Sequence, residues 1–351
     1  MKVYIDLLPD IPYIPLLYPN LGVQESSTIM FLNRAFGGLR KPLVEIVDTP
    51  EASDYILLPH NYSSLKTQNA YVIKQGTLAK KLGKKLIIFW HGDGDAPIDN
   101  DNAIVFRTSQ YRTSIQKNEI MMPAYAEDLL EGELQLRDKH SGPSTSLRVN
   151  KPVIGFCGWA DYKNLKNHIG TVVKNSLIEA SSIVGIRREA RIKGITYRMK
   201  AIKHLQQSTL IEPNFIIRSS YSGHTSTIKT DPAQTRKEYV DNLLDSDYAL
   251  IIKGDGNYSY RFYEALSLGR IPVLLDTECV LPLEDVIDYN QFILRVPYWD
   301  MYHLDAIVAD HYSKISDQDF ITMQKKGREA FNTYLRVDSF LSYAITNSLP
   351  A

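Results

Sequence analysis

The residues best suited to bind a phosphate lie in the run KGDGNYSYRFYEALSLGRIPVLLD (253–276). An apolar strand pattern leads into the loop GDGN, where Gly254 and Gly256 permit positive φ and a close approach of the backbone to a ligand. A helix is predicted over 258–269, with Ser259 at its N-cap and a glycine at its end. The free N–H groups and the positive dipole end at such a helix start favour a phosphate.

Two charged side chains on this helix extend the candidate site. Arg261 lies in the first turn and can give a bidentate contact to a phosphate. Glu264 follows three residues later on the same face, and its carboxylate can accept from two vicinal hydroxyls such as those of a ribose. The alternative is a simple ion pair on a solvated helix face. A carboxylate and a diphosphate binder on one face are what a nucleotide-sugar site needs. The loop is neither GxGxxG nor GxxxxGK[ST], which disfavours a dinucleotide oxidoreductase or a P-loop enzyme.

Strand and helix patterns alternate along the chain, as in parallel sheets covered by helices. The strands predicted in the first half are 2–8, 54–60, 84–92 and 102–109, with a helix over 70–83. A polar segment rich in Ser, Gly and Pro follows at 126–151. After it, strands are predicted at 152–159, 215–221, 248–254 and 270–276, and helices at 187–207, 235–244 and 258–269.

This double pattern predicts an α/β protein with two Rossmann-like domains that face an interdomain cleft. We place the first domain at 1–145 and the second at 146–317. The remaining segment, 318–351, is assigned to helices that could pack back across the seam.

The composition disfavours several classes of protein. Lys plus Arg and Asp plus Glu both number 40 in 351 residues, and this balance argues against a general nucleic-acid binder. The two cysteines, Cys157 and Cys279, lie in apolar runs and are expected as buried thiols. No stretch approaches the ~20 apolar residues of a membrane-spanning helix. We therefore expect a cytoplasmic protein without a transmembrane segment, for which peripheral membrane contact stays open.

The run 245–297 resembles the C-terminal signature of exostosin-like glycosyltransferases of the GT47 type. The signature is a strand that ends in a Gly-containing loop, followed in order by RFYEAL (261–266), GRIPV (269–273) and LPLEDVID (281–288). About fifty residues match in order and spacing, which makes the resemblance far more specific than the glycine loop alone.

Weaker similarities to the same family extend outward, to ASDYILLPH (52–60), IIFWHGDGD (87–95) and VIGFCGW (153–159). The resemblance implies a GT-B fold, inversion at the anomeric carbon and, most commonly, a UDP-sugar donor. The sequence lacks the N-terminal anchor and the lumenal cysteines of animal and plant members. This departure is expected of a soluble, bacterial-style relative, and it puts analogies to the acceptors of those members in doubt.

The resemblance also implies an arginine that faces the donor diphosphate soon after the first strand of the second domain, which indicates Arg187 or Arg188. Arg218 and Lys253 end predicted strands, where α/β sheets bind ligands. Tyrosine rings near the loop suit stacking on a sugar or base. The predicted nucleotide-sugar contacts are Arg187, Arg188, Arg218, Lys253, Gly254, Gly256, Asn257, Ser259, Tyr260, Arg261 and Glu264.

An inverting transfer needs a general base that takes the proton of the acceptor hydroxyl. The loop HGDGD (91–95) leaves a first-domain strand, so its polar tip is expected to overhang the cleft. Among His91, Asp93, Asp95 and Glu25 we favour Asp93. Glu25 could instead lie in the first turn of a helix that begins near residue 26.

The spacing of Asp93 and Asp95 also occurs in divalent-cation sites, but the further ligands of such a site are absent from the sequence around them. Arginines and a helix N-terminus can neutralise a leaving diphosphate without a metal. We therefore predict no metal ion and no obligate cofactor, with the nucleotide-sugar as co-substrate.

The sequence thus predicts an inverting glycosyltransferase that moves a sugar from a nucleotide-sugar, most commonly a UDP-sugar, to a glycan or other hydroxyl acceptor, as in surface polysaccharide synthesis. The first domain would bind the acceptor and the second the donor. One alternative is a GT-B enzyme of another activity, a nucleotide-sugar epimerase or a phosphorylase. A second is a non-catalytic glycan-binding relative. The donor sugar, the acceptor and the linkage depend on loop side chains that the sequence does not place.

Overall fold

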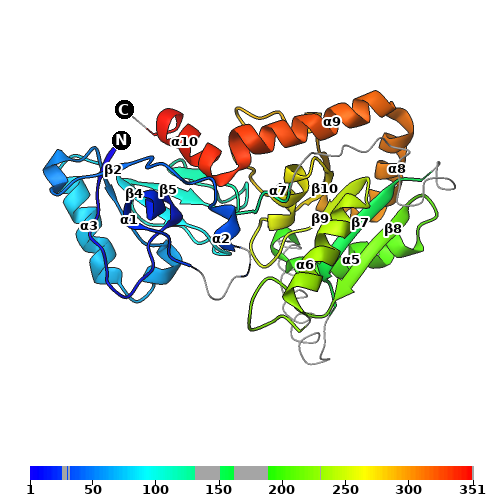
Figure 1. Ribbon diagram of the computed structural model, residues 1–351, viewed down its shortest axis with the longest axis horizontal. Helices are drawn as coiled ribbons and strands as arrows, with labels where there is room; N and C mark the ends of the chain where they lie inside the picture. The colour runs from blue at the N-terminus through cyan, green and yellow to red at the C-terminus, as the bar shows by residue number, and fades with distance from the viewer. Residues whose placement is uncertain (26–29, 31, 131–150, 162–188, 230, 350–351) are drawn as a thin grey trace.

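The computed structural model describes residues 1–25, 30, 32–130, 151–161, 189–229 and 231–349. The chain forms two sheets whose strands are all parallel, each associated with helices (Figure 1). The predicted α/β architecture with two Rossmann-like sheets is therefore confirmed.

The first sheet has the strand order β2-β1-β3-β4-β5-β6. Its strands are β1 (Lys2–Tyr4), β2 (Glu45–Ile46), β3 (Tyr55–Leu57), β4 (Leu86–Trp90), β5 (Ala103–Arg107) and β6 (Glu119–Met121). The helices around it are α1 (Tyr18–Leu21), α2 (Leu32–Ala35) and α3 (Asn69–Lys81). The strand predicted over 2–8 ends early, because Asp6 turns toward α3 and accepts hydrogen bonds from Lys74 and Gln75.

The second sheet has the order β11-β10-β9-β7-β8. Its strands are β7 (Val153–Trp159), β8 (Glu212–Arg218), β9 (Tyr248–Ile251), β10 (Ile271–Asp276) and β11 (Leu294–Pro297). The helices are α5 (Gly194–Gln207), α6 (Pro232–Leu244), α7 (Tyr260–Ser267) and α8 (Leu304–Lys314). From β7 the chain goes first to one neighbour, β8, and then to the other, β9. The carboxyl ends of β7 and β9 therefore form the topological switch point at which such sheets bind ligands.

Strand β9 shows why its sequence is a continuous apolar run. Tyr248, Leu250 and Ile252 belong to the core under α5 and α8. Ala249 and Ile251 face the opposite core, which includes α7. A parallel strand covered by helices on both faces needs apolar residues at every position.

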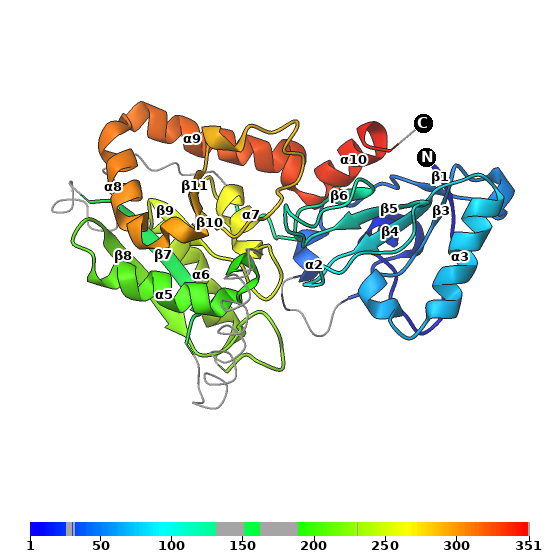
Figure 2. The same cartoon turned by 180° about the vertical axis from the view of Figure 1, so that it is seen from behind.

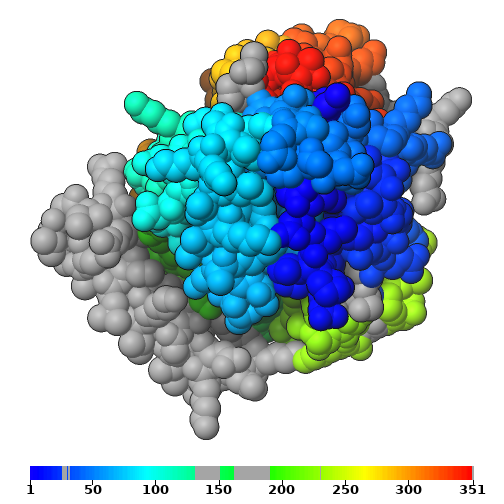
Figure 3. All heavy atoms as spheres, turned by 90° about the vertical axis from the view of Figure 1, so that its left-hand side faces the viewer, coloured from blue at the N-terminus to red at the C-terminus, as the bar shows by residue number. Residues whose placement is uncertain are grey.

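The C-terminal helices connect the two sheets (Figures 1 and 2). Helix α9 (Asp317–Ala330) packs against α7 and β10, a π-helical turn follows at Phe331–Leu335, and α10 (Val337–Asn347) reaches the first sheet. There the Phe340 ring meets Phe106 of β5 edge to face, with ring centroids 6.4 Å apart. Figure 3 shows these helices, in red and orange, along the upper edge of the first domain. The C-terminal helices therefore pack back across the seam between the two domains.

Within the described ranges, no helix combines the length and the apolar character needed to cross a membrane. Both cysteines are free and buried, as expected.

Candidate functional site

Two arginines meet at the switch point of the second sheet. Arg198, on α5, donates to the Trp159 carbonyl at the end of β7 (3.2 Å) and to the Ile252 carbonyl just after β9 (3.1 Å). Arg261, in the first turn of α7, donates to the Cys157 carbonyl of β7. Its guanidinium lies 4.3 Å from the centre of the Phe156 ring. Among the described residues, the contacts of these two side chains are thus carbonyls and rings, with no carboxylate among them.

The two guanidiniums are close enough to repel each other. Burial, and next the positive charge of Arg261, lower the pKa of Arg198 to about 10. In the described part of the chain, the Nε atoms of both arginines are buried without a hydrogen-bond partner. Two neighbouring cations with unused donors favour the binding of an anion, which would relieve both the repulsion and the desolvation.

Arg198 was not predicted as a site residue, because it looked like one of several cations on a solvated helix. The helical period carried the missing signal. Arg198 lies three residues after Ile195 and four before Ile202, and both isoleucines are buried. A residue at this spacing lies on the inner face of the helix.

The glycine loop approaches the first domain closely. Neither Gly254 nor Gly256 adopts the positive φ that glycine permits, so that part of the prediction is wrong. At Gly256 the backbone lies close to a protein carboxylate, since a Cβ there would lie 2.7 Å from Oδ1 of Asp93. The Gly256 N–H donates to this same oxygen at 3.1 Å. The space that a side chain would take at this position is therefore filled by a carboxylate from the other domain.

Helix α7 begins and ends almost as predicted. Ser259 is the N-cap residue, but its side chain makes no capping hydrogen bond. At the other end Gly269 has a φ of +61°. The Gly269 N–H donates to Leu266 and the Arg270 N–H to Ala265, which is the hydrogen-bond pattern of a glycine-terminated helix.

Glu264 faces α6 instead of Arg261. It is 8% exposed, and its carboxylate accepts from the Tyr239 hydroxyl (2.6 Å) and from Arg236 (3.0 Å). Arg236 is also paired with Glu127 of the first domain, at 2.5 Å. The alternative ion pair between Arg261 and Glu264 is therefore not what the structure shows.

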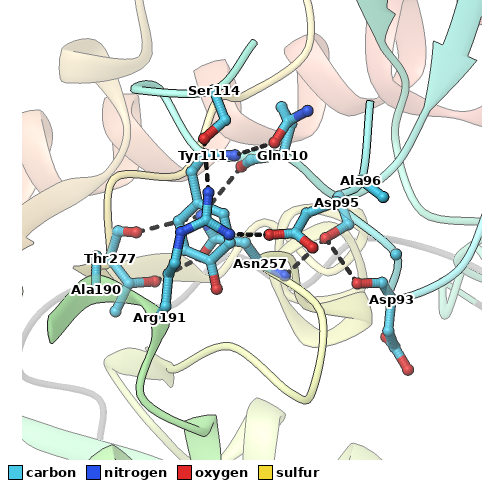
Figure 4. A network of polar contacts seen from close by, with 12 residues as sticks. Asp93, Asp95, Ala96, Gln110, Tyr111, Ser114, Ala190, Arg191, Asn257 and Thr277 are labelled. Carbon is cyan, nitrogen blue, oxygen red and sulfur yellow. Dashed lines mark hydrogen bonds and ion pairs between the residues drawn. The ribbon is translucent and has the colours of Figure 1, made fainter. Parts of the chain in front are cut away.

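Three other predicted donor contacts form hydrogen bonds within the protein. Lys253 is 3% exposed and donates to the Tyr111 hydroxyl (2.9 Å) and the Ala190 carbonyl (2.5 Å), and burial lowers its pKa to about 7. Arg218 pairs with Glu238 at 2.8 Å. The Asn257 amide donates to the carbonyls of Gln110 (3.0 Å) and Thr277 (3.2 Å) (Figure 4).

The Tyr260 ring packs edge to face on Tyr258, with ring centroids 5.7 Å apart. Arg187 and Arg188 lie outside the described residues.

The structure separates the four candidate bases. Asp95 is paired with Arg191, which also donates to the Ser114 hydroxyl at 2.6 Å (Figure 4). The His91 ring packs edge to face on the Tyr125 ring, with ring centroids 4.2 Å apart. Burial lowers the pKa of His91 to about 4. Glu25 is exposed, and the helix expected to begin near residue 26 falls on residues that the structure does not describe.

Asp93 is the candidate that touches the glycine loop. Its side chain keeps an exposed surface, yet the protein around it raises the pKa of its carboxyl, first by burial and second through the nearby charge of Asp255. A raised pKa brings a carboxylate closer to the range in which it acts as a general base near neutral pH.

Among the residues with described positions, no group of three or more His, Cys, Asp or Glu side chains is arranged to hold a metal ion. Asp93 and Asp95 engage different partners, Gly256 and Arg191, and do not point at a common centre.

Part of the second domain is similar to a known protein family. The family model of the exostosin GT47 domain matches residues 193–310. This stretch of the chain is similar to the exostosin GT47 domain. The resemblance predicted from the RFYEAL, GRIPV and LPLEDVID segments is thereby confirmed.

Two curated relatives of this exostosin-like stretch are animal proteins. The chain is 27% identical over 101 residues to an exostosin-1 homologue of Caenorhabditis elegans, which covers 29% of this chain and 25% of the relative. It is 45% identical over 56 residues to exostosin-1 of Drosophila melanogaster, which covers 16% of this chain and 7% of the relative. The match therefore spans a quarter or less of the length of these proteins.

Two solved structures are loosely similar to the whole chain. One is TarM, with a TM-score of 0.35 and 10% identity over 83% of this chain and 54% of that one. The other is a glycosyltransferase from Rickettsia africae, with a TM-score of 0.36 and 12% identity over 94% of this chain and 85% of that one.

The exostosin domain match includes Arg198, Arg261 and Glu264, whereas Asp93 lies in the other domain. The candidate site is therefore composite: its cations come from the family domain, and its best-placed carboxylate comes from the sheet beside it.

Proposed function

We propose that the protein is an inverting glycosyltransferase that uses a nucleotide-sugar donor, most simply a UDP-sugar, and a hydroxyl acceptor such as a glycan. One observation carries this proposal. Where the carboxyl ends of β7 and β9 meet, Arg198 and Arg261 of the exostosin-like stretch present two guanidiniums for which the described residues supply no contacting carboxylate, and the neighbouring glycine loop contacts the Asp93 carboxylate of the other domain.

In this proposal the donor diphosphate binds at Arg198 and Arg261. The site is formed by the carboxyl ends of β7 and β9, where backbone carbonyls already orient both guanidiniums. The negative charge that develops on the leaving diphosphate would be stabilised by groups that are positioned before the reaction begins. Arginine suits this role because its planar fork matches two phosphate oxygens.

Glu264 would bind the ribose hydroxyls of the donor. Tyr239 and Arg236 hold its carboxylate in place, so its remaining acceptor capacity is oriented and not free to rotate. A carboxylate accepts more than two hydrogen bonds, so this assignment is compatible with its present partners.

Asp93 would remove the proton of the acceptor hydroxyl as that oxygen attacks the anomeric carbon of the donor. The bond from the anomeric carbon to the diphosphate oxygen breaks as the new glycosidic bond forms, and the diphosphate leaves toward the arginines. Attack from the face opposite the leaving group inverts the configuration. Asp93 is carried by the first domain, so we also propose that the acceptor binds on that side.

The donor arrangement that we propose requires no obligate metal ion, since two guanidiniums supply the positive charge. A cytoplasmic location and a role in surface polysaccharide synthesis, with peripheral membrane contact, complete the proposal.

A screen of nucleotide-sugars tests it in two steps. Thermal shift identifies which nucleotides stabilise the protein, since a ligand that binds only the folded state at 100 times its Kd adds about 2.7 kcal/mol. Release of the nucleoside diphosphate is then measured with mixed acceptor glycans, and the product linkage is read by NMR. Binding without transfer to any acceptor would favour the non-catalytic glycan-binding alternative. Interconversion of the donor sugar without transfer would favour the epimerase.

A further inference from the structure

Arg107, the last residue of β5, is completely buried in the first domain and has no direct contact with the proposed substrates. Its exposed fraction is 0%. Its guanidinium donates from Nη2 to the carbonyl of Gly94 (2.8 Å) and from Nη1 to the carbonyl of Ala96 (3.2 Å). These two carbonyls flank Asp95 and follow Asp93, so Arg107 binds the backbone of the loop that carries both aspartates.

The same loop is packed from below by Trp90, the last residue of β4. The Arg107 guanidinium lies 4.6 Å from the centre of the Trp90 ring. On the loop itself, a Cβ at position 94 would lie 2.3 Å from the indole, so only glycine allows the backbone to rest there. The loop backbone is therefore held both by an aromatic ring, at Gly94, and by a guanidinium, at the carbonyls of Gly94 and Ala96.

The buried charge of Arg107 is balanced in a way that fixes its orientation. Glu119 of β6 pairs with its Nη1, and the two side chains are 0% and 1% exposed. The other Glu119 oxygen accepts from Gln110 (3.0 Å) and from the Gln116 N–H (3.0 Å). Such a pair costs desolvation, and it is retained where its hydrogen bonds specify a geometry.

Arg107 also connects this loop to the donor loop. Its Nε donates to the carbonyl of Ser109 at 3.1 Å. The Ser109 hydroxyl accepts from the Asn257 N–H (2.9 Å) and contacts the Asp93 carbonyl (3.4 Å). The backbone of the Asp93 loop and that of the donor loop are thus linked through Ser109, which Arg107 holds.

We propose that Arg107 is a positioning residue: it sets the distance and direction of the Asp93 carboxylate relative to the donor loop, and the rate of sugar transfer depends on it through Asp93. This inference rests on the proposed function for its kinetic consequence. Its structural content, that Arg107 orders the loop 91–97, is independent of any activity.

Lysine cannot replace arginine here. The guanidinium directs donors to Ser109, Ala96, Gly94 and Glu119 from three nitrogens in one plane. The lysine ammonium is a single point with three donors and cannot span carbonyls on both sides of the fork. Arg107→Lys therefore retains the charge opposite Glu119 and loses the geometry, which makes it the informative substitution.

The kinetic test is a double-mutant cycle of Arg107→Lys with Asp93→Asn. Arg107→Lys is expected to lower kcat by roughly a hundredfold, the usual effect of about 1 Å of misplacement, with the affinity for UDP unchanged. If the effect passes through Asp93, adding Arg107→Lys to Asp93→Asn lowers kcat little further. A full, multiplicative loss in the double mutant would show that Arg107 supports the fold without positioning Asp93, and would overturn the proposal.

A matched control is Arg270→Lys. Arg270 is also buried, at 3%, and bonds to Gln324 of α9, away from the loop 91–97. It is expected to lower the melting temperature without lowering kcat. An equal kcat loss in both lysine variants would assign the effect to general destabilisation.

Hydrogen–deuterium exchange gives a readout that needs no activity. In Arg107→Lys the amides of His91 and Gly92, which donate to the side chains of Asn61 and Thr108, should exchange at least about tenfold faster, while those of α5 and α7 keep their wild-type rates. Unchanged exchange at these two amides would overturn the proposal even in an active enzyme. If the wild-type protein transfers no sugar from any donor, the proposed function fails, and the exchange experiment still decides whether Arg107 orders the loop.

Discussion

The first-domain loop after β4 and the second-domain loop after β9 touch where the Gly256 N–H donates to Asp93, and they obtain their charge in opposite ways. The first-domain loop after β4 carries its own charged groups, and a buried guanidinium behind it binds its backbone. The second-domain loop after β9 has glycines at 254 and 256 on either side of Asp255, whose charge raises the pKa of Asp93. Its cations come from two helices, Arg198 of α5 and Arg261 of α7. One side therefore presents a carboxylate and the other an anion site.

This difference explains where a motif is informative. In the first domain the charged residues of HGDGD are themselves the candidates. Their different partners in the structure distinguish them. In the second domain the glycine loop marks the position of the ligand but not the residues that bind its charge. Those residues lie far away in sequence and are brought together by the β7/β9 switch point.

The largest effect on the rate of transfer should come from a substitution of Asp93, the carboxylate of the first-domain loop. Asp93→Asn keeps the size and most of the hydrogen bonding of the side chain but removes its basicity. We expect kcat to fall about a hundred- to ten-thousandfold with nucleotide affinity near wild type, as for loss of a general base. Since the pKa of Asp93 is raised, the wild-type rate should fall with decreasing pH at a higher pH than for an ordinary aspartate, and this limb should vanish in the variant.

Three conservative variants form the comparison set: Asp95→Asn, His91→Gln and Glu25→Gln. Asp95→Asn also breaks the ion pair with Arg191 and therefore tests this contact between the two domains more than basicity. If Asp93→Asn turned over normally with an authentic acceptor while one of these did not, the base would have to be reassigned to that residue.

The next largest effect should be on nucleotide binding, through the two guanidiniums of the second domain. Arg198→Ala and Arg261→Ala are each expected to weaken nucleotide binding about ten- to a hundredfold, since a hydrogen bond to a charged group contributes roughly 1.5–3 kcal/mol. Isothermal titration with UDP measures the loss directly. Lys237→Ala on α6, an exposed cation paired with Asp241, is the control for a general change in charge.

Glu264 needs a gentler substitution, because truncation would leave Arg236 and Tyr239 without their partner. Glu264→Gln keeps both contacts within reach and removes the charge proposed for the ribose. Undiminished binding of UDP in Arg198→Ala, Arg261→Ala and Glu264→Gln together would show that the donor binds elsewhere.

The sequence predicted the elements that follow strong periodicity. The strands β3, β4, β5, β7, β9 and β10 and the end of α7 at Gly269 lie where the apolar runs and the glycine indicated. Sequence reasoning missed the short strands β2 and β6, whose few residues give no periodic signal. Such strands are defined by pairing with their neighbours, which no local pattern contains.

For the site, the sequence predicted which loops meet better than it predicted the role of each residue in them. Lys253 and Asn257 were expected to contact the donor, but their polar atoms bond to Tyr111 and Gln110 of the other domain. Arg107 read as the end of a strand, and its importance depends on a loop eleven to thirteen residues earlier in the chain. A residue type alone does not say whether a buried cation binds a ligand or the protein itself.

A smaller effect should appear in the free energy of unfolding. It concerns Lys253, a residue of the second domain that bonds to Tyr111 of the first. Its pKa is about 7 in the folded protein against an ordinary value of 10.5, because burial disfavours the ammonium. Between these two pH values the folded state binds fewer protons than the unfolded state, so the free energy of unfolding rises with pH. The slope contributed by this group approaches 1.4 kcal/mol per pH unit.

The measurement compares urea unfolding of wild type and Lys253→Met between pH 7 and pH 9.5. The wild-type protein should gain stability relative to the variant as the pH rises through this window, and the difference should level off below pH 7. Lys237→Met, at an exposed position, should run parallel to wild type. Parallel curves for Lys253→Met as well would mean that the buried ammonium keeps its proton and its ordinary pKa.

The smallest expected effect is that of a chelator. If guanidiniums on the basic side balance the leaving diphosphate, then EDTA should change kcat by less than roughly twofold. The two aspartates of HGDGD engage different partners, with Asp95 on Arg191 and Asp93 on Gly256, so a shared cation would have to displace both contacts. Adding magnesium or manganese to the chelated enzyme should likewise leave the rate unchanged. Loss of turnover in EDTA that manganese restores would reverse the comparison between the two loops, because the acidic side would then bind the cation that neutralises the diphosphate. Asp95→Asn distinguishes the two cases: for a metal ligand it abolishes the rescue by manganese, whereas for an ion-pair partner of Arg191 it has no effect on the response to metal.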